Sequence, residues 1–473
     1  MLYLSKLNMK LKLFLLTCLS LFSTLGIAQL GNNNMYLVKN LNTRPGTGSQ
    51  RYSACWGYVA PNGREYAILG CYGGTQIVDI TDSANIREVG WVPTTNAASS
   101  SNNWREMKPI GHYLYVGSEV ANSGIQIIDL QYLPDSVSYK GKFQTGTLSS
   151  SHTITTDGTF LYVNGTNTSF NNQGITIFSV ANPIAPVQIG AWTTEYVHDS
   201  RVINDTIYAS NIYSGYLTII NATNKANPVT VRRFQTTPNP FTHNSARTTD
   251  GRFILTTDET SSPNGKLKIW NVENLNNITF VRNWLPTNIS TAIVHNVEIY
   301  GRYALIAHYT AGVRLLDIAD PTNPVEVAWY DTYPTNNNSN FNGCWGVYMF
   351  PSGKIIASDM TTGLYVLKTN FALTNTTTTS SVVPENFTMS QNYPNPFNPT
   401  TKINFSLPKS SNVTLKVFDA SGKEVASLLN DRRDAGSYTV SFDAAKYGLS
   451  SGIYFYTLKT NDFSETKKMT LIK

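Results

Sequence analysis

The sequence predicts an all-β protein, with a seven-bladed β-propeller followed by a small C-terminal antiparallel β-sandwich. Three observations lead to this prediction. A unit of 45–52 residues recurs seven times in the middle of the chain, and each unit contains short apolar segments typical of strands. Four such strands per unit is the pattern of a propeller blade. The C-terminal region has a different composition and contains several strands of alternating polarity.

The basic surplus of the chain lies at its two ends. The formal net charge is +6 over 473 residues. Residues 1–28 hold three Lys and no acid, and residues 384–473 hold eleven basic against eight acidic residues. Residues 29–383 carry 22 of each sign. Because this central region is neutral and has no basic run with interleaved aromatic residues, we expect no binding to nucleic acid.

Residues 1–28 have the features of a secretory signal peptide. Lys10 and Lys12 precede an apolar run that ends in the small-residue site Gly26-Ile27-Ala28. The run is too short for a comfortable membrane span, and no later stretch is long enough to be a transmembrane segment. We therefore expect a secreted protein, with a propeller domain over residues 29–370.

Each of the seven units begins with a polar or aromatic triplet before its first strand. A turn such as Asp157-Gly158 joins this strand to an apolar second strand, and a Gly leads into a third strand such as Val313 to Ile318. An Asn-Pro type turn and a fourth strand complete the unit. The opening triplets are Cys55-Trp56-Gly57, Asn103-Trp104-Arg105, Ser151-His152-Thr153, Val197-His198-Asp199, Thr242-His243-Asn244, Val294-His295-Asn296 and Cys344-Trp345-Gly346.

The unit that begins at Cys344 contains only three strands and ends near Leu367. We expect residues 35–39, near the N-terminus, to supply its fourth strand. Such an exchange closes the ring and removes open sheet edges.

Three cysteines follow the signal segment, so one disulfide and one free thiol are expected in an oxidising compartment. Cys55 and Cys71 lie symmetrically about Gly63 in a predicted hairpin turn and could face each other. Cys344 occupies the position equivalent to Cys55, which makes Cys55–Cys344 the rival pairing.

The third strands resemble the LVIVD repeat of bacterial and archaeal surface proteins. The region from about residue 50 to 370 resembles the choice-of-anchor B family, whose propellers are joined to varied surface anchors. This resemblance implies a fold and a surface location, without a settled activity. The matching segments are Cys55-Trp56-Gly57, Gly63 to Ala67, Trp104-Arg105-Glu106, Thr242-His243, Asp258-Glu259, Tyr309 to Asp317 and Phe341 to Trp345.

The C-terminal part is predicted to be a separate module. Residues 371–384 read as a Thr/Ser-rich linker, and residues 385–473 contain the strands of the predicted sandwich. The segment from Gln391 to Lys473 resembles the type A sorting domain of type IX secretion. The resemblance implies that the type IX secretion machinery is a partner, and that the passenger crosses the outer membrane and is attached to the cell surface after the domain is removed.

Four histidines open the first strand of four successive units. Equivalent positions of first strands surround one mouth of a propeller channel, and the ends of second strands return to that mouth. Imidazole and carboxylate groups converging there predict a site for a divalent metal ion. The expected ligands are His152, His198, His243, His295, Glu119, Asp258, Glu259 and Asp359.

Aromatic residues are expected to complete this ring and to form a ligand-binding wall. The expected ligand-binding residues at the channel mouth are Trp56, Trp104, Arg105 and Trp345. A structural role competes with the metal prediction, because a His at a strand start can also tie neighbouring blades by hydrogen bonds. The aspartates at third-strand ends, Asp79, Asp129 and Asp317, are expected to stabilise turns.

No motif identifies a catalytic residue, since neither a nucleophile elbow nor a phosphate-binding loop is present. We therefore expect a secreted, surface-displayed binding or interaction module rather than an enzyme. We expect its ligand to be a protein or a glycan at the cell surface. The alternative is a metal-dependent hydrolase or lyase with its site at the His-lined mouth.

Overall fold

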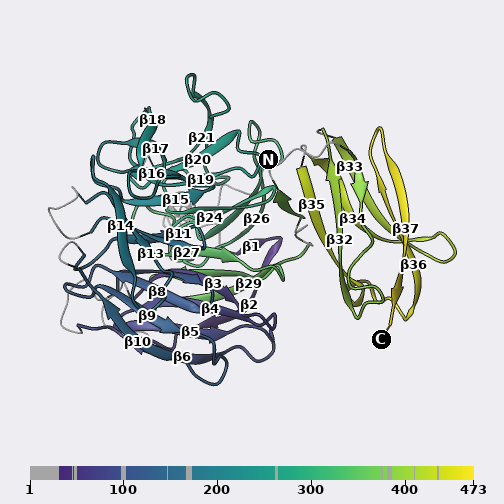
Figure 1. Ribbon diagram of the computed structural model, residues 1–473, viewed down its shortest axis with the longest axis horizontal. Coiled ribbons are helices and arrows are strands. Elements are labelled where there is room, and N and C mark those ends of the chain that lie inside the picture. The colour runs from purple at the N-terminus through teal and green to yellow at the C-terminus, as the bar shows by residue number, and fades with distance from the viewer. Residues whose placement is uncertain are drawn as a thin grey trace, which may run out of the picture.

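The computed structural model describes the chain from residue 31 to residue 472 with short gaps (Figure 1). The described ranges are 31–44, 46, 51–96, 103–145, 148–166, 173–261, 265–371, 373, 376–380, 386–409, 411–433 and 436–472. The predicted signal peptide lies outside the described residues.

Seven antiparallel sheets follow one another around a ring, which is the predicted seven-bladed propeller (Figure 1). Blades 1–4 contain the strands β3 (Tyr52–Val59), β4 (Glu65–Cys71), β5 (Gly74–Asp79) and β6 (Arg87–Pro93); β7 (Arg105–Ile110), β8 (Tyr113–Ser118), β9 (Ile125–Asp129) and β10 (Ser138–Phe143); β11 (Thr153–Thr156), β12 (Phe160–Asn164), β13 (Ile175–Ser179) and β14 (Val187–Trp192); and β15 (Asp199–Ile203), β16 (Thr206–Asn211), β17 (Tyr216–Asn221) and β18 (Val229–Gln235).

Blades 5–7 complete the ring, and the last two include strands from the N-terminus. Their strands are β19 (Thr242–Arg247), β20 (Phe253–Asp258), β21 (Leu267–Asn271) and β22 (Thr279–Trp284); β23 (Val297–Tyr300), β24 (Tyr303–Ala307), β25 (Val313–Asp317), β26 (Val325–Tyr330) and β1 (Asn32–Asn33); and β27 (Cys344–Met349), β28 (Ile355–Asp359), β29 (Gly363–Thr369) and β2 (Met35–Leu41).

Burial changes in a regular way from the second strand of a blade to the fourth. All residues of β4 and β5 in blade 1 are buried, whereas the fourth strand β6 is mostly half-exposed. The second and third strands are apolar runs rich in β-branched residues because neighbouring blades cover both of their faces. The core is therefore a series of apolar layers between adjacent blades.

The predicted closure of the ring is confirmed. Strand β2 pairs antiparallel with β29, from Met35 opposite Thr369 to Leu41 opposite Leu364. In all seven blades the fourth strand has a one-residue bulge where it pairs with the third strand. Strand β2 has this bulge too, although it comes from the N-terminus and the other six fourth strands directly follow the third strands of their blades in the sequence. A β-bulge increases local twist. The N-terminal strand is thus a fourth strand in geometry as well as in position.

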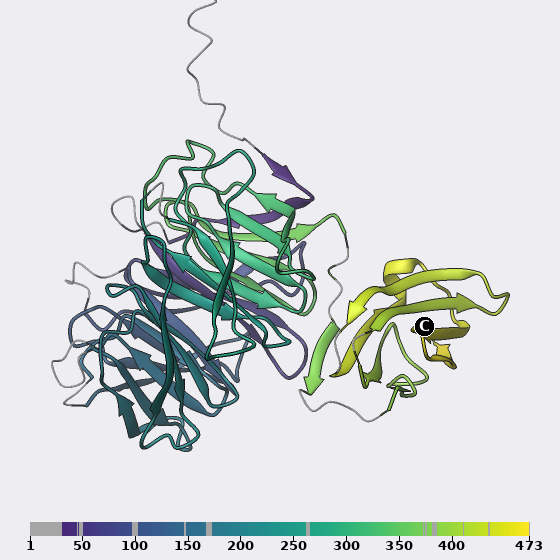
Figure 2. The same cartoon turned by 90° about the horizontal axis from the view of Figure 1, so that it is seen from above.

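Blade 6 has an unexpected fifth strand. Residues Asn32 and Asn33 form β1, which pairs with β26 at the outer edge of the sheet. Figure 2 shows this segment in purple beside the green strands of the later blades. The edge of β26 is thereby covered by the same N-terminal segment that completes blade 7.

The aspartates at third-strand ends stabilise turns, as predicted. The carboxylate of Asp79 accepts a hydrogen bond from the backbone of Thr81 at 3.0 Å, and Asp129 and Asp317 accept equivalent bonds from the residues two positions later. These side chains belong to the turns between the third and fourth strands.

Neither predicted disulfide is present. Cys55, Cys71 and Cys344 are all free and buried. The expected pairing across the hairpin was wrong, because a register shift between Tyr52 and Cys55 places Cys71 opposite Tyr52 and Cys55 opposite Leu69. Burial raises the pKa of the Cys55 thiol to about 12 and also raises that of the other two thiols.

The C-terminal module is a sandwich of two four-stranded sheets around its own apolar core (Figure 1). Part of the predicted linker, residues 376–380, forms a strand that pairs with β35 at the edge of one sheet. The strands are β30 (Thr376–Ser380), β31 (Thr388–Met389), β32 (Thr400–Leu407), β33 (Ser411–Asp419), β34 (Glu424–Arg433), β35 (Gly436–Asp443), β36 (Gly452–Lys459) and β37 (Ser464–Leu471). A short 3-10 helix, Ala444–Tyr447, follows β35. Within the described ranges, no helix has the length and apolar character needed to cross a membrane.

Candidate functional site

The four predicted histidines form a continuous row of rings at one mouth of the propeller channel. The ring centroids of His152 and His198 are 4.0 Å apart, those of His198 and His243 are 4.3 Å apart, and those of His243 and His295 are 4.4 Å apart. Each histidine lies at the start of the first strand of its blade, or just before it. The repeat therefore places four imidazoles from four blades in contact.

Two of the three tryptophans named from the sequence, Trp104 and Trp345, extend the row of histidines. The Trp345 ring lies 4.3 Å from that of His295, and Trp104 stacks on Trp345 with a centroid separation of 4.7 Å. Both indoles are only partly buried. An aromatic wall thus adjoins the histidines.

The Nδ1 atoms of two histidines tie their blades to the next blade. His243 Nδ1 lies 3.2 Å from the carbonyl oxygen of His295, and His295 Nδ1 contacts the carbonyl oxygen of Trp345. A carbonyl can only accept, so Nδ1 carries the proton and Nε2 keeps its lone pair. Metal-binding histidines are commonly held in this way by a hydrogen bond from the other ring nitrogen. The structural role and the metal role are therefore compatible in the same side chains.

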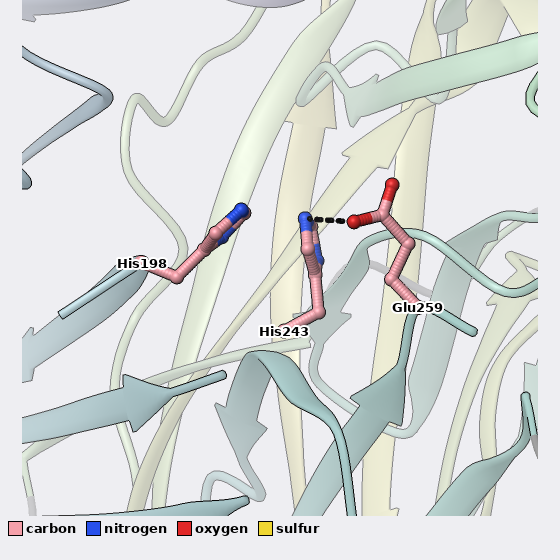
Figure 3. A group of neighbouring side chains, drawn as sticks. All are labelled: His198, His243 and Glu259. Carbon is pink, nitrogen blue, oxygen red and sulfur yellow. Dashed lines mark ion pairs between the residues drawn. The ribbon is translucent and has the colours of Figure 1, made fainter. Parts of the chain in front are cut away.

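Glu259 directs its carboxylate at these Nε2 atoms. Its Oε2 lies 3.4 Å from His243 Nε2, and its Oε1 lies 3.7 Å from His295 Nε2. His198, His243 and Glu259 each offer one ligand atom, and these atoms all lie within 4.8 Å of one another. Figure 3 shows the two imidazoles side by side with the carboxylate turned toward His243.

The electrostatic environment keeps these imidazoles neutral. Burial, followed by the neighbouring histidines, holds the pKa of His198 and His243 well below the ordinary value, and burial lowers the pKa of His295 to about 3. Burial also raises the pKa of Glu259 to about 7, although a hydrogen bond from Tyr309 opposes this shift. Neutral imidazole is the form that binds metal ions.

Tyr309 holds Glu259 from a strained backbone. Its hydroxyl donates a hydrogen bond to Glu259 Oε1, and its side chain is fully buried. Its φ is 31°, in the left-handed region that bulky residues rarely adopt. Two backbone hydrogen bonds to Cys344, at 3.1 and 2.9 Å, fix this conformation. Backbone strain of this kind concentrates at functional sites. Sequence analysis did not predict this role, because only Gly312, three residues later, marks the turn.

Glu119 forms a separate pair with His152. Its Oε1 contacts His152 Nδ1, and the hydrogen bond and charge of this carboxylate outweigh the effect of burial and raise the pKa of His152. Glu119 directly follows β8, as Glu259 directly follows β20. The two glutamates therefore occupy equivalent positions, and each contacts the row of histidines.

Two aspartates predicted as ligands have other partners in the structure. Asp258 pairs with Lys268 Nζ at 2.5 Å and accepts a backbone hydrogen bond from Phe241 at 3.0 Å. Asp359 accepts backbone hydrogen bonds from Thr361 and Thr362, both at 2.9 Å. Each aspartate is the last residue of the second strand of its blade, and both are fully buried. They stabilise loops, and the glutamate after Asp258 faces the histidines instead.

Trp56 lies outside the row of rings. In blade 7 the bulge after Cys344 leaves Trp345 without a paired residue, whereas Trp56 pairs regularly with Ile68 within blade 1. The same triplet therefore turns its tryptophan in different directions in the two blades. The indole of Trp56 lies under Lys108, with Nζ 3.4 Å from the ring centroid, in a pocket further along the channel.

Arg105 is buried rather than exposed at the mouth. Only 3% of this residue is exposed, and its Cγ lies beside Gly70 of the neighbouring blade. Burial lowers the pKa of its guanidinium to about 10. Arg105 is thus part of the packing between blades 1 and 2.

Comparisons with known proteins identify two segments of the chain. Residues 391–473 match the family model of the secretion system C-terminal sorting domain, and residues 293–332 match that of the LVIVD repeat. The second match covers β23–β26, and the first covers most of the C-terminal sandwich. No curated protein matches the chain.

Solved structures resemble the chain only weakly. A putative 6-phosphogluconolactonase from Bacteroides fragilis has 12% identity and a TM-score of 0.46, and the match covers 68% of this chain and 94% of that one. A periplasmic gluconolactonase from Pseudomonas aeruginosa has 13% identity and a TM-score of 0.45, with 62% and 88% covered. A functionally unknown protein from Desulfotomaculum acetoxidans has 12% identity and a TM-score of 0.45, with 77% and 96% covered. Likeness at this level says nothing about the activity of this chain.

The two family matches agree with the division into a propeller and a C-terminal sandwich, and with the two resemblances noted in the sequence. A sorting domain at the C-terminal end directs export and attachment, and it supports an interaction with the type IX secretion machinery. The chain therefore carries an LVIVD repeat in its propeller and a secretion system C-terminal sorting domain, and it is a secreted protein attached to the outer cell surface.

Proposed function

We propose that the protein is a surface-displayed binding module whose channel mouth binds a transition metal ion of the Zn²⁺ type. The observation that carries this proposal is the convergence of His198, His243 and Glu259, whose ligand atoms lie within 4.8 Å of one another. His295 extends the set, because its Nε2 is buried, has no hydrogen-bond partner in the described part of the chain and lies 3.7 Å from Glu259.

The chemistry of the donors favours a transition metal over Ca²⁺. Imidazole nitrogen suits Zn²⁺, Cu²⁺ and Ni²⁺, whereas Ca²⁺ takes six to eight oxygen ligands. Three imidazoles and one carboxylate match the ligand number and the ligand types of a tetrahedral zinc site. Trp104 and Trp345 give the ion an aromatic surround on one side, so a ligand held by the metal would also contact the indoles.

Metal analysis of the purified protein tests the proposal. After incubation with Zn²⁺ and dialysis, we expect about one equivalent of metal by mass spectrometry and saturable binding by calorimetry. His243→Ala and Glu259→Gln remove ligands, and each is expected to weaken binding by at least tenfold. His112→Ala is a matched control, because His112 pairs with Asp129 outside the channel. Absence of stoichiometric metal, or full binding by folded His243→Ala, would contradict the proposal.

A metal-dependent hydrolase is the second candidate function. The observation that favours it is the His152–Glu119 pair, since His152 lies next to His198 and a histidine paired with a carboxylate is a common general base. Ester hydrolysis that requires Zn²⁺ and is lost in His152→Gln, with metal binding retained, would support this candidate. Metal binding without hydrolysis of any ester or lactone in a panel of substrates would contradict the hydrolase and favour the binding module.

A further inference from the structure

The propeller channel contains a second pocket. The histidines lie at the starts of the first strands, whereas this pocket is lined by residues further along these strands. Its volume is about 210 Å³, and we call it the basic pocket. Its lining comes from the first strands of blades 1 to 6 and consists of Trp56, Lys108, Thr155, Thr156, Arg201, Val202, Ile203, Ala246, Arg247, Glu298 and Ile299.

The basic pocket is separate from the histidine row. His198 precedes β15, and Arg201 is the third residue of that strand. A strand rises roughly 3.3 Å per residue, so the two positions are about 10 Å apart along the channel. A polar layer lies between them, in which Asn244 donates to the carboxylate of Asp199 and accepts from the backbone of Val297 at 3.1 Å. The two sites therefore do not share ligand groups.

Positive charge dominates the lining of the basic pocket. Lys108, Arg201 and Arg247 face one carboxylate among the lining residues, that of Glu298. Arg201 binds Glu298 through one terminal nitrogen. Lys108 binds Glu106 at 2.5 Å, and Glu106 lies two residues earlier in the same strand. The pocket thus retains a surplus of cationic donors.

Some terminal guanidinium nitrogens of Arg201 and Arg247 have no hydrogen-bond partner among the described residues. Arg201 donates from Nε to the Ser245 carbonyl at 3.3 Å, and its second terminal nitrogen makes no hydrogen bond to the described residues. Arg247 donates from Nε to the Gly251 carbonyl at 3.1 Å, and neither terminal nitrogen has a hydrogen-bond partner in the described ranges. A guanidinium presents its N–H groups in a planar fork that matches a carboxylate.

The remaining walls fit a small organic molecule. Trp56, Val202 and Ile299 supply apolar surface, and Thr155 and Thr156 of β11 add hydroxyl groups to the lining. Apolar walls with a few convergent polar groups characterise ligand pockets, and drug-sized ligands occupy roughly 300–1,000 Å³. A volume of about 210 Å³ corresponds to a smaller ligand.

We propose that the basic pocket binds a small carboxylate anion, such as a sugar acid, through the free guanidinium nitrogens of Arg201 and Arg247. The carboxylate lies against the two arginines, and the rest of the ligand contacts Trp56. This site does not depend on metal at the histidine row, so the two proposals can fail independently.

Calorimetry with D-glucuronate tests the proposal, with D-glucose as the neutral analogue and sulfate as the inorganic anion. We expect saturable binding of glucuronate that EDTA does not change. Arg247→Gln should weaken it about tenfold or more, in line with the loss of a charged hydrogen bond. The pair Arg201→Gln with Glu298→Gln removes both charges of the ion pair and leaves none uncompensated, and it should weaken binding likewise. Arg232→Gln is the control, because Arg232 is exposed on the outer strand β18.

Three results would overturn the proposal. Glucose binding as tightly as glucuronate would show that the carboxylate is not recognised. Sulfate binding as tightly would show a general oxyanion site. Glucuronate binding that the folded channel variants retain would place the ligand elsewhere.

Discussion

Single residues at the channel mouth serve the fold and the proposed site together. The hydrogen bond from His243 to the His295 carbonyl joins two blades and at the same time sets the tautomer of the ring. Removing His243 therefore affects both. A conservative change in a residue that only positions a ligand separates the two roles more cleanly.

Tyr309→Phe is such a change. It removes the hydroxyl that donates to Glu259 and keeps the buried ring. We expect Zn²⁺ affinity to fall by about 10–100-fold, as for other losses of a supporting hydrogen bond. The thermal midpoint should fall by a few degrees at most. Calorimetry and thermal unfolding of the same preparation measure both, and unchanged affinity would show that Tyr309 does not position Glu259.

The buried thiols give a prediction about pH. With a pKa of about 12, only about one Cys55 thiol in 10,000 is ionised at pH 8. Cys71 and Cys344 are shifted in the same direction. We expect no alkylation by iodoacetamide at pH 8 in the folded protein and three modified cysteines after unfolding, counted by mass spectrometry on protein without residues 1–28. Rapid modification of the folded protein would contradict the assigned burial.

Residue type and repeat position predicted the histidine row, but the sequence misplaced several of its neighbours. Asp258 is the last residue of β20 and Glu259 follows it, so which of the two acids faces the channel depends on the local register at the end of this strand, because neighbouring residues of a strand point in opposite directions. The bulges also differ between the first and the last blade, which is why Trp56 and Trp345 diverge. Bulges of this kind have no signature in a single sequence.

At the scale of elements, the closing strand of the last blade was predictable. The last unit lacked one strand, and the segment at residues 35–39 had a suitable pattern. Strands β1 and β30 were not predicted, because Asn32-Asn33 and the Thr-rich segment have no apolar alternation. Both short strands pair at the edge of an existing sheet, and a sheet edge offers unpaired backbone groups to any nearby extended segment.

The closing strand permits a matched pair of substitutions. Leu41 is 5% exposed and packs between blades 7 and 1, whereas Leu37 of the same strand is 40% exposed. We expect Leu41→Ala to lower the free energy of unfolding by about 2–4 kcal/mol. Leu37→Ala should change it by less than about 1 kcal/mol. Chemical denaturation of both variants tests this, and equal effects would mean that β2 does not seal the ring.

At the scale of the whole molecule, delivery and binding belong to different parts of the chain. The sorting domain accounts for surface attachment, and the propeller holds both proposed sites. The apolar core of the sandwich is distinct from the clusters between the blades. The division was predictable because it follows a change in composition, whereas the ligands depend on details of register.

Deleting residues 391–473 should abolish delivery to the cell surface and leave metal binding by the propeller intact. We expect the truncated protein to be absent from the cell surface, as measured by antibody labelling of intact cells, because the sorting signal is missing. The purified propeller should retain Zn²⁺ binding with an affinity within about threefold of the full chain, because no proposed ligand lies in the deleted part. Surface labelling of the truncated protein would contradict the role of the domain.

The N-terminal closing strand also determines when the propeller can be finished. Asn40 of β2 bonds to the carbonyl of Thr362, 322 residues later. Joining segments so far apart costs about 5 kcal/mol in chain entropy, and contacts of such long range form late in folding. Strand β2 is therefore synthesised before the first strand of every blade but can pair only after β29 of the last one, and a chain that stops before β29 has no partner for it. The ring can therefore close only in a chain that extends at least to β29.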